Sequence, residues 1–234
     1  MKHIFEHAMI GRLPLKNRII RSATFEFALD ENDDFSANLL SMYEKMANNE
    51  VAAIITGMVA VEANSRVRQS MIKTYAQTFV QELTQVAERM HKLGTKLIVQ
   101  INHCGQKAAR IDGGGPLLGP CDTENTQGEA VKGMSHEDIR SVTANFAAAA
   151  VRCKQAGADA VQIHAAHGYL LSQFLNPCYN KRVDEYGETI QGRARIVLEI
   201  YEAVRAAVGS DYPVWIKINS RDLTEESIST EEFL

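Results

Sequence analysis

Short runs of apolar, mostly β-branched residues recur along the chain, and longer amphipathic stretches separate them. These runs predict five strands, at Arg18–Thr24, Ala52–Val61, Lys96–Asn102, Ala160–Ala166 and Val214–Asn219. In the second and third runs the apolar residues do not alternate with polar ones. Such runs are typical of strands that are covered on both faces, as they are in a parallel sheet.

Between the runs, apolar residues return at helical spacing, which predicts an amphipathic helix in each interval. The four stripes lie over residues 39–46, 79–93, 139–153 and 194–208. Gly94, Gly157 and Gly209 follow the last three stripes, and glycine readily takes the left-handed conformation that ends a helix. At the start of the third stripe, Ser135 and Asp138 form the pattern of a capping box, with Asp in the place of Glu.

The alternation of strands and helices indicates an α/β fold with parallel strands. A doubly wound sheet and a (β/α)8 barrel both produce this order. No G-x-G-x-x-G pattern follows the first predicted strand, which weakens the dinucleotide-binding form of the doubly wound sheet. A long polar segment, His103–Met134, follows the third strand, and loops in that position build the active site of a barrel. About five βα units fit the chain, and Ser229–Leu234 resembles the start of a further helix.

The composition limits the function classes. The 234 residues carry 25 Lys and Arg against 29 Asp and Glu, a formal net charge of -4 without any basic block, so a nucleic-acid binder is not expected. The longest apolar run, Phe146–Val151, is far shorter than the ~20 residues that cross a bilayer. The four cysteines form no C-x-x-C pair, and the N-terminus lacks the apolar core of a signal peptide. We therefore expect a cytoplasmic protein with reduced thiols and no membrane partner.

The densest group of reactive side chains follows the fourth predicted strand. His164, His167 and Tyr169 lie within six residues, so they can face one pocket at the carboxyl end of that strand. Two imidazoles can hold an anionic or carbonyl oxygen, and a phenol can give a proton. The alternative is that these are ordinary loop residues. A metal site completed by His103 and Asp159 or Asp184 is a weaker alternative, because no H-E-x-x-H pattern supports it.

Two polar residues lie inside predicted strands. Gln100 is near the end of the third strand, and its amide suits the edge of a heterocycle such as a flavin pyrimidine. Lys217 lies within the fifth strand, where a lysine must find an anion or line a cavity. Their ordinary interpretations are an amide bound to neighbouring loop backbone and a lysine that reaches solvent past the helices.

Three segments closely resemble the Old Yellow Enzyme family of FMN-dependent oxidoreductases. They are Leu15–Thr24 (LKNRIIRSAT), Val99–Gly105 (VQINHCG) and His164–Arg195, which contains H-x-A-H-G-Y-L and N-x-R-x-D-E-Y-G. The paired histidines bring the chain closer to the bacterial branch with NADH:flavin oxidoreductases and 2,4-dienoyl-CoA reductases. The yeast enzymes have Asn in the second position. Phe25 stands where some bacterial members carry a flavin-tuning Cys.

The resemblance implies a (β/α)8 TIM barrel with FMN across its top, and it implies that NADH or NADPH is the reductant. It implies that the flavin contacts come from six residues: Ala23, Thr24, Gly57, Met58, Gln100 and Lys217. His164 and His167 would hold the carbonyl oxygen of a small molecule with an activated C=C bond, and Tyr169 would protonate its α-carbon. No metal ligand is implied.

The family continues for about another hundred residues or more, so residues 1–234 are expected to form a single FMN-binding domain truncated before strands six to eight. Two alternatives to an ene-reductase stay open. One is a flavin-free family remnant that acts as a folded fragment or binds a partner, and the other is a metal-assisted hydrolase barrel. A homo-oligomer is also possible.

Overall fold

The computed structural model describes residues 3–26, 35–68, 71–110, 115–220 and 227–233. Its centre is a five-stranded parallel sheet in the order β10-β9-β5-β4-β3. The strands are β3 (Ile20–Arg21), β4 (Ala53–Ala60), β5 (Lys96–Asn102), β9 (Ala160–Ala165) and β10 (Val214–Ile218). All five predicted strands are therefore present, and β5 has the predicted bounds. The first is much shorter than predicted, because only Ile20 and Arg21 pair with β4.

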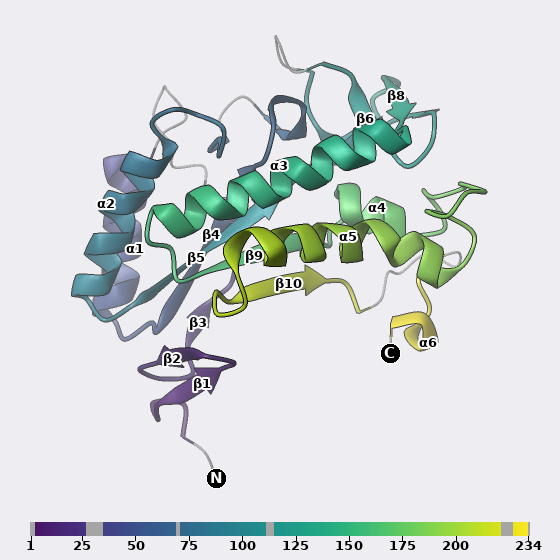
Figure 1. The fold of residues 1–234 in the computed structure, drawn as a ribbon. Coiled ribbons are helices and arrows are strands. Elements are labelled where there is room, and N and C mark those ends of the chain that lie inside the picture. Colours follow the sequence, from purple (N-terminus) through teal and green to yellow (C-terminus); the bar gives the residue numbers. More distant parts are fainter. Residues whose placement is uncertain (1–2, 27–34, 69–70, 111–114, 221–226, 234) are drawn as a thin grey trace.

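Helices cover one face of this sheet, and α3 and α5 lie side by side across it (Figure 1). The α-helices are α1 (Ala37–Asn48), α2 (Phe79–Lys92), α3 (His136–Gln155), α4 (Leu170–Leu175), α5 (Ile190–Val208) and α6 (Thr230–Phe233). The predicted capping box is confirmed, because Ser135 and Asp138 bond each other's backbone N–H groups at the start of α3. No described helix is long and apolar enough to cross a membrane.

Alternate residues of the strands serve two different cores. Leu97, Val99 and Ile101 of β5 point to the helices and join the main hydrophobic cluster. Ile98, from the other face, joins a smaller cluster with Leu13 and Leu15. This period of two also sends Gln100 to the inner face. The inner face is thus apolar toward the amino ends of the strands and polar toward their carboxyl ends.

Two small sheets and two 3-10 helices were not predicted. The hairpin of β1 (Ala8–Ile10) and β2 (Leu13–Leu15) lies below the amino ends of the main strands (Figure 1). The predicted polar loop between β5 and α3 contains a second sheet, together with the 3-10 helix η2 (Gly105–Lys107), and a further 3-10 helix, η1 (Ala63–Ser65), follows β4. The second sheet is formed by β6 (Leu117–Gly119), β7 (Thr123–Glu124) and β8 (Ala130–Gly133). Its strands are too short to show a period in the sequence.

The main sheet has open edges at β3 and β10 among the described strands. On β10, Ile216 is 46% exposed and Ile218 is 40% exposed. An apolar edge strand is a template for pairing with another chain. We therefore expect a polypeptide of residues 1–234 to associate with further copies through these edges. A sizing column measures this property, and a monomer at micromolar concentration would contradict the expectation.

Candidate functional site

A pocket of about 160 Å³ opens at the carboxyl ends of the strands, and we call it the histidine pocket. Eight residues line it: Ala23, Thr24, Phe25, Met58, Gln100, His164, His167 and Tyr169. Seven of these are among the nine site residues expected from the sequence. The other two, Gly57 and Lys217, lie next to it. Residues from four strands or their ends thus meet in one place, although 146 positions separate the first from the last.

His164 is buried at the end of β9, and its protonation state follows from its surroundings. Its Nδ1 accepts a hydrogen bond from the backbone N–H of Ala166 at 3.2 Å. Burial, together with the nearby His167 and Lys217, lowers its pKa to about 3. A neutral imidazole that accepts at Nδ1 carries its proton at Nε2. His164 is therefore a neutral Nε2–H donor at physiological pH.

His167 lies on a tight left-handed turn after β9. Its φ is 60°, and that of Gly168 is 69°. This region is costly for a residue with a side chain, by roughly 1–2 kcal/mol. Two contacts hold the turn: the backbone N–H of His167 donates to Asn219 Oδ1 at 3.2 Å, and Lys107 Nζ donates to the His167 carbonyl at 2.9 Å. The positive φ of Gly168 favours glycine here, and a Cβ at this position would displace the Lys107 ammonium, which would lie 2.7 Å away.

The His164 ring contacts the rings of His167 and Tyr169 edge to face. The centroids of His164 and His167 lie 5.0 Å apart, and those of His164 and Tyr169 lie 5.1 Å apart. Burial, with a smaller contribution from the neighbouring Cys104, raises the pKa of Tyr169 to about 12. Burial also lowers the pKa of His167, as do Lys217 and Lys107. The pocket therefore combines neutral imidazoles with a phenol that keeps its proton.

Gln100 is 2% exposed, and its side chain is oriented by a second amide. Its Nε2 donates to Gln162 Oε1 at 2.7 Å, and the two residues are register partners on β5 and β9. This bond leaves the Gln100 oxygen as an acceptor for a ligand N–H. Gln162 was missed in the sequence, although it lies two positions before His164 and must share its face of the strand.

Gly57 does not line the pocket. Its N–H donates to Glu26 Oε1 at 2.9 Å, and a Cβ on Gly57 would collide with Glu26 Oε2. Glu26 also accepts from Arg21 at 2.7 Å and from the Tyr43 hydroxyl at 2.8 Å. The chain that follows β3, including Ala23 and Thr24, is thus tied to β4 through one carboxylate. The flavin contact of Gly57 stays a prediction.

Lys217 faces the inner side of the sheet at its open edge. It is the register partner of His164 on β10, and its Nζ donates to Ser22 Oγ at 3.2 Å. Ser22 immediately precedes Ala23 of the histidine pocket. The ammonium also lowers the pKa values of both pocket histidines. Lys217 therefore places a cation beside the histidine pocket and does not extend past the helices into solvent.

The residues of the metal alternative do not come together. His103 is buried and bonds Glu62 through Nε2 at 2.8 Å, while Asp159 bonds Lys96 at 2.9 Å and Asp184 bonds Arg182. One group of three potential ligands lies close together in the described part of the chain, and it consists of His136, Asp184 and Glu185. Neither His164 nor His167 belongs to it.

Comparison with known proteins agrees with this architecture. Residues 3–233 match the NADH:flavin oxidoreductase / NADH oxidase family. The chain is 30% identical over 236 residues to an NADPH dehydrogenase of Halalkalibacterium halodurans, and it covers 68% of that protein.

Two solved structures are similar to the chain. Old Yellow Enzyme from Pichia sp. AKU4542 superimposes with a TM-score of 0.89 at 28% identity, covering 97% of this chain and 62% of that one. A 2-naphthoyl-CoA reductase complex gives a TM-score of 0.91 at 25% identity, covering 98% of this chain and 37% of that one. The expected fold class, an incomplete (β/α) barrel, is confirmed. The chain belongs to the NADH:flavin oxidoreductase / NADH oxidase family.

Proposed function

We propose that the protein is an FMN-dependent oxidoreductase that uses NADH or NADPH to reduce an activated C=C bond. The observation that carries this proposal is the histidine pocket, where two neutral imidazoles and a protonated phenol face the residues expected to contact a flavin. The relatives named NADPH dehydrogenase and Old Yellow Enzyme support the reductant and the reaction class. Because the chain covers only part of each of these proteins, the activity of the whole protein is a proposal.

The two histidines would bind the carbonyl oxygen of the substrate. His164 donates from Nε2, and the centroids of the His164 and His167 rings lie 5.0 Å apart, so one substrate oxygen can contact both rings. Donors aimed at a developing oxyanion stabilise the transition state more than the ground state. The hydrogen bonds draw electrons from the conjugated bond and make its β-carbon electrophilic. Tyr169 would then give its proton to the α-carbon.

The donor set of the pocket fits a flavin ring. The edge of the flavin pyrimidine presents an N–H between two carbonyl groups, and Gln100 offers an oxygen acceptor whose orientation Gln162 fixes. Lys217 would contribute the positive charge that a reduced flavin attracts. When bound and reduced by NADH or NADPH, the flavin would supply the hydride that the β-carbon receives. Backbone at Ala23 and Thr24 and the side chain of Met58 would line the ring.

A two-step assay tests the proposal. The protein is purified, its visible absorbance is recorded, and NADPH or NADH is added without oxygen. We expect a flavin spectrum that bleaches with the reductant and returns when cyclohexenone is added, with cyclohexanone as the product. A colourless protein that takes up no added FMN would contradict the flavoenzyme and would favour the remnant. A metal-dependent hydrolase would require bound metal, which elemental analysis measures.

Lys217→Met should lower the reduction potential of the flavin. Methionine keeps the length of the stem but removes the charge beside the site. Losing a cation near a new anion costs on the order of 1–4 kcal/mol, which is about 20–90 mV for a two-electron couple. Spectroelectrochemical titration measures the potential, and Lys217→Arg should stay near the parental value. An unchanged potential in the methionine variant would place Lys217 away from the flavin.

Gln162→Leu should weaken FMN binding. The Gln100 amide would lose its 2.7 Å partner and its fixed orientation, and a buried polar group without a partner costs about 1–3 kcal/mol. We therefore expect an increase of roughly tenfold in the dissociation constant of FMN, measured by fluorescence quenching. Gln162→Glu keeps the acceptor oxygen and should retain most of the affinity. Equal affinity in the leucine variant and the parent would show that the amide pair does not orient the flavin.

A further inference from the structure

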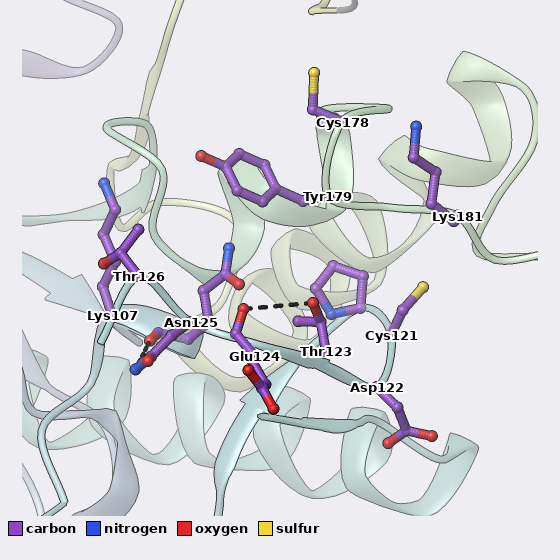
Figure 2. Close-up of a pocket in the computed structure, with 12 residues that line it drawn as sticks. Lys107, Cys121, Asp122, Thr123, Glu124, Asn125, Thr126, Cys178, Tyr179 and Lys181 are labelled. Atoms are coloured by element: carbon purple, nitrogen blue, oxygen red, sulfur yellow. Dashed lines mark hydrogen bonds between the residues drawn. The ribbon is translucent and has the colours of Figure 1, made fainter. Parts of the chain in front are cut away.

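A second and larger pocket is lined in part by Lys107, the residue that bonds the turn carrying His167. Its volume is about 340 Å³, and we call it the hairpin pocket because residues 120–126 of the small sheet form one wall. Three residues of the loop after α4 form the opposite wall: Cys178, Tyr179 and Lys181 (Figure 2). Nothing in the chemistry of the histidine pocket uses these residues.

Lys107 joins the two pockets. It lines the hairpin pocket, and its Nζ donates to the carbonyl of His167 at 2.9 Å. The same Nζ lies 5.7 Å from the centroid of the Tyr169 ring. His167 and Tyr169 both line the histidine pocket. An ammonium has three N–H donors and the His167 carbonyl takes one, so Lys107 can also bind an anionic group that passes from one pocket to the other.

Tyr179 gives the hairpin pocket an open aromatic surface. The residue is 41% exposed, and its ring lies across the pocket opposite Thr123 and Asn125 (Figure 2). An exposed aromatic face in a pocket suits a planar heterocycle, because every base can stack on it.

The charged groups are unevenly distributed around this ring. The carboxylates of Asp122 and Glu124 point away from Tyr179 in Figure 2, and Asp122 Oδ1 accepts from the backbone N–H of Gly133 at 2.8 Å. The hydroxyl end of Tyr179 points toward the side of Lys107 (Figure 2). Lys181 also lines the pocket. The arrangement offers a stacking surface in the middle and a cation at the crossing to the histidine pocket.

We propose that the hairpin pocket binds the adenosine phosphate half of NAD(P)H. This inference rests on the proposed function, in which NADH or NADPH reduces the flavin, so the nicotinamide has to enter the histidine pocket. That pocket is less than half as large as the hairpin pocket, so the remainder of the dinucleotide must lie outside it. Lys107 meets a phosphate at the crossing, and Tyr179 stacks on the adenine. The histidine pocket thus binds the nicotinamide ring, while the hairpin pocket binds the adenosine phosphate half of the reductant.

Tyr179→Leu tests the stacking surface in the FMN-loaded protein. We expect the KM for NAD(P)H to rise about five- to tenfold, as the loss of one base–aromatic stack predicts, with kcat within about twofold of the parent. Flavin reduction by 1-benzyl-1,4-dihydronicotinamide, which lacks the adenosine phosphate, should not change. Tyr179→Phe keeps the ring and should keep the parental KM. Tyr201→Leu is the matched control, because Tyr201 is 42% exposed on α5, outside both pockets.

Titration with 5′-AMP and 2′,5′-ADP separates this inference from the proposed function. Binding of either probe to the parent that weakens at least fivefold in Tyr179→Leu, but not in Tyr201→Leu, supports the hairpin pocket. The inference is overturned if the parent binds neither probe at millimolar concentration, or if Tyr179→Leu leaves the KM for NAD(P)H unchanged. If the benzyl analogue fails to reduce the flavin of the parent, the proposed function is wrong, and the AMP titration still decides whether the pocket binds a nucleotide.

Discussion

His164→Ala and His167→Ala should each slow the reduction of cyclohexenone by about 10²–10³-fold, the usual loss when one oxyanion donor is removed. Each change removes an N–H that faces the position of the substrate carbonyl. The two imidazoles lie 5.0 Å apart, so neither alone replaces the other. Steady-state rates with cyclohexenone measure the effect, and the affinity for a phenolate ligand should fall in parallel. Flavin reduction by NAD(P)H should suffer less, because no substrate oxyanion forms in that step.

Two controls separate the donor role from a structural one. His167→Asn retains an N–H donor at the same turn and should keep more activity than His167→Ala. His91→Ala changes a histidine that bonds Asp159, outside the pocket, and should leave the rate unchanged. Parental rates in both alanine variants of the pocket would show that the two histidines do not stabilise an oxyanion.

The state of His164 also gives the pH dependence a definite sign. Its pKa is about 3 in the folded protein, against an ordinary value of 6.5. Between about pH 6.5 and pH 3 the unfolded chain protonates this imidazole while the folded chain keeps it neutral. The free energy of unfolding is therefore unaffected by His164 above about pH 6.5 and decreases as the pH falls toward 3. Donation from Nε2 therefore persists through the neutral range. A loss of activity near pH 6.5 could not be assigned to His164.

The fold could largely be predicted because local signals agreed with the tertiary arrangement. Lys96–Asn102 formed a strand with the predicted bounds, since its apolar face and its inner face each have a core to meet. Gly94, Gly157 and Gly209 all have positive φ, as their place after the apolar stripes predicted. The short helix α4 was not predicted. Its six residues are all buried, so they show no polar face from which a helical period could be read.

The grouping of the site could be anticipated, because the carboxyl ends of parallel strands meet at one edge of a sheet. The residues that orient the site were harder to find. Lys107 contacts His167 across 60 positions, and Gln162 contacts Gln100 across 62 positions. Glu26 binds the N–H of Gly57 across 31 positions. Such contacts depend on strand register and on loop paths, which hydrophobic periodicity does not encode. Only Gln162 had a signal in the sequence, its even spacing from His164.

Tyr169→Phe should lower the rate of alkene reduction by about 10²–10⁴-fold, the usual contribution of a positioned proton donor. The ring of Tyr169 is held against His164 at 5.1 Å and below the Lys107 ammonium at 5.7 Å, so phenylalanine should keep the packing. Only the hydroxyl proton is lost. Because the pKa of Tyr169 is about 12, this proton is present throughout the neutral range.

The two half-reactions distinguish this role from a general loss of structure. In stopped-flow experiments the flavin of Tyr169→Phe should be reduced by NAD(P)H at close to the parental rate, while its reoxidation by cyclohexenone becomes slow. Phenolate binding should persist, because the two histidine donors are unchanged. Tyr212→Phe is a suitable control, since it removes a buried hydroxyl that donates to the Ala158 carbonyl at 3.0 Å, remote from the pocket. Parental reoxidation of Tyr169→Phe by the enone would mean that another group, or water, delivers the proton to the α-carbon.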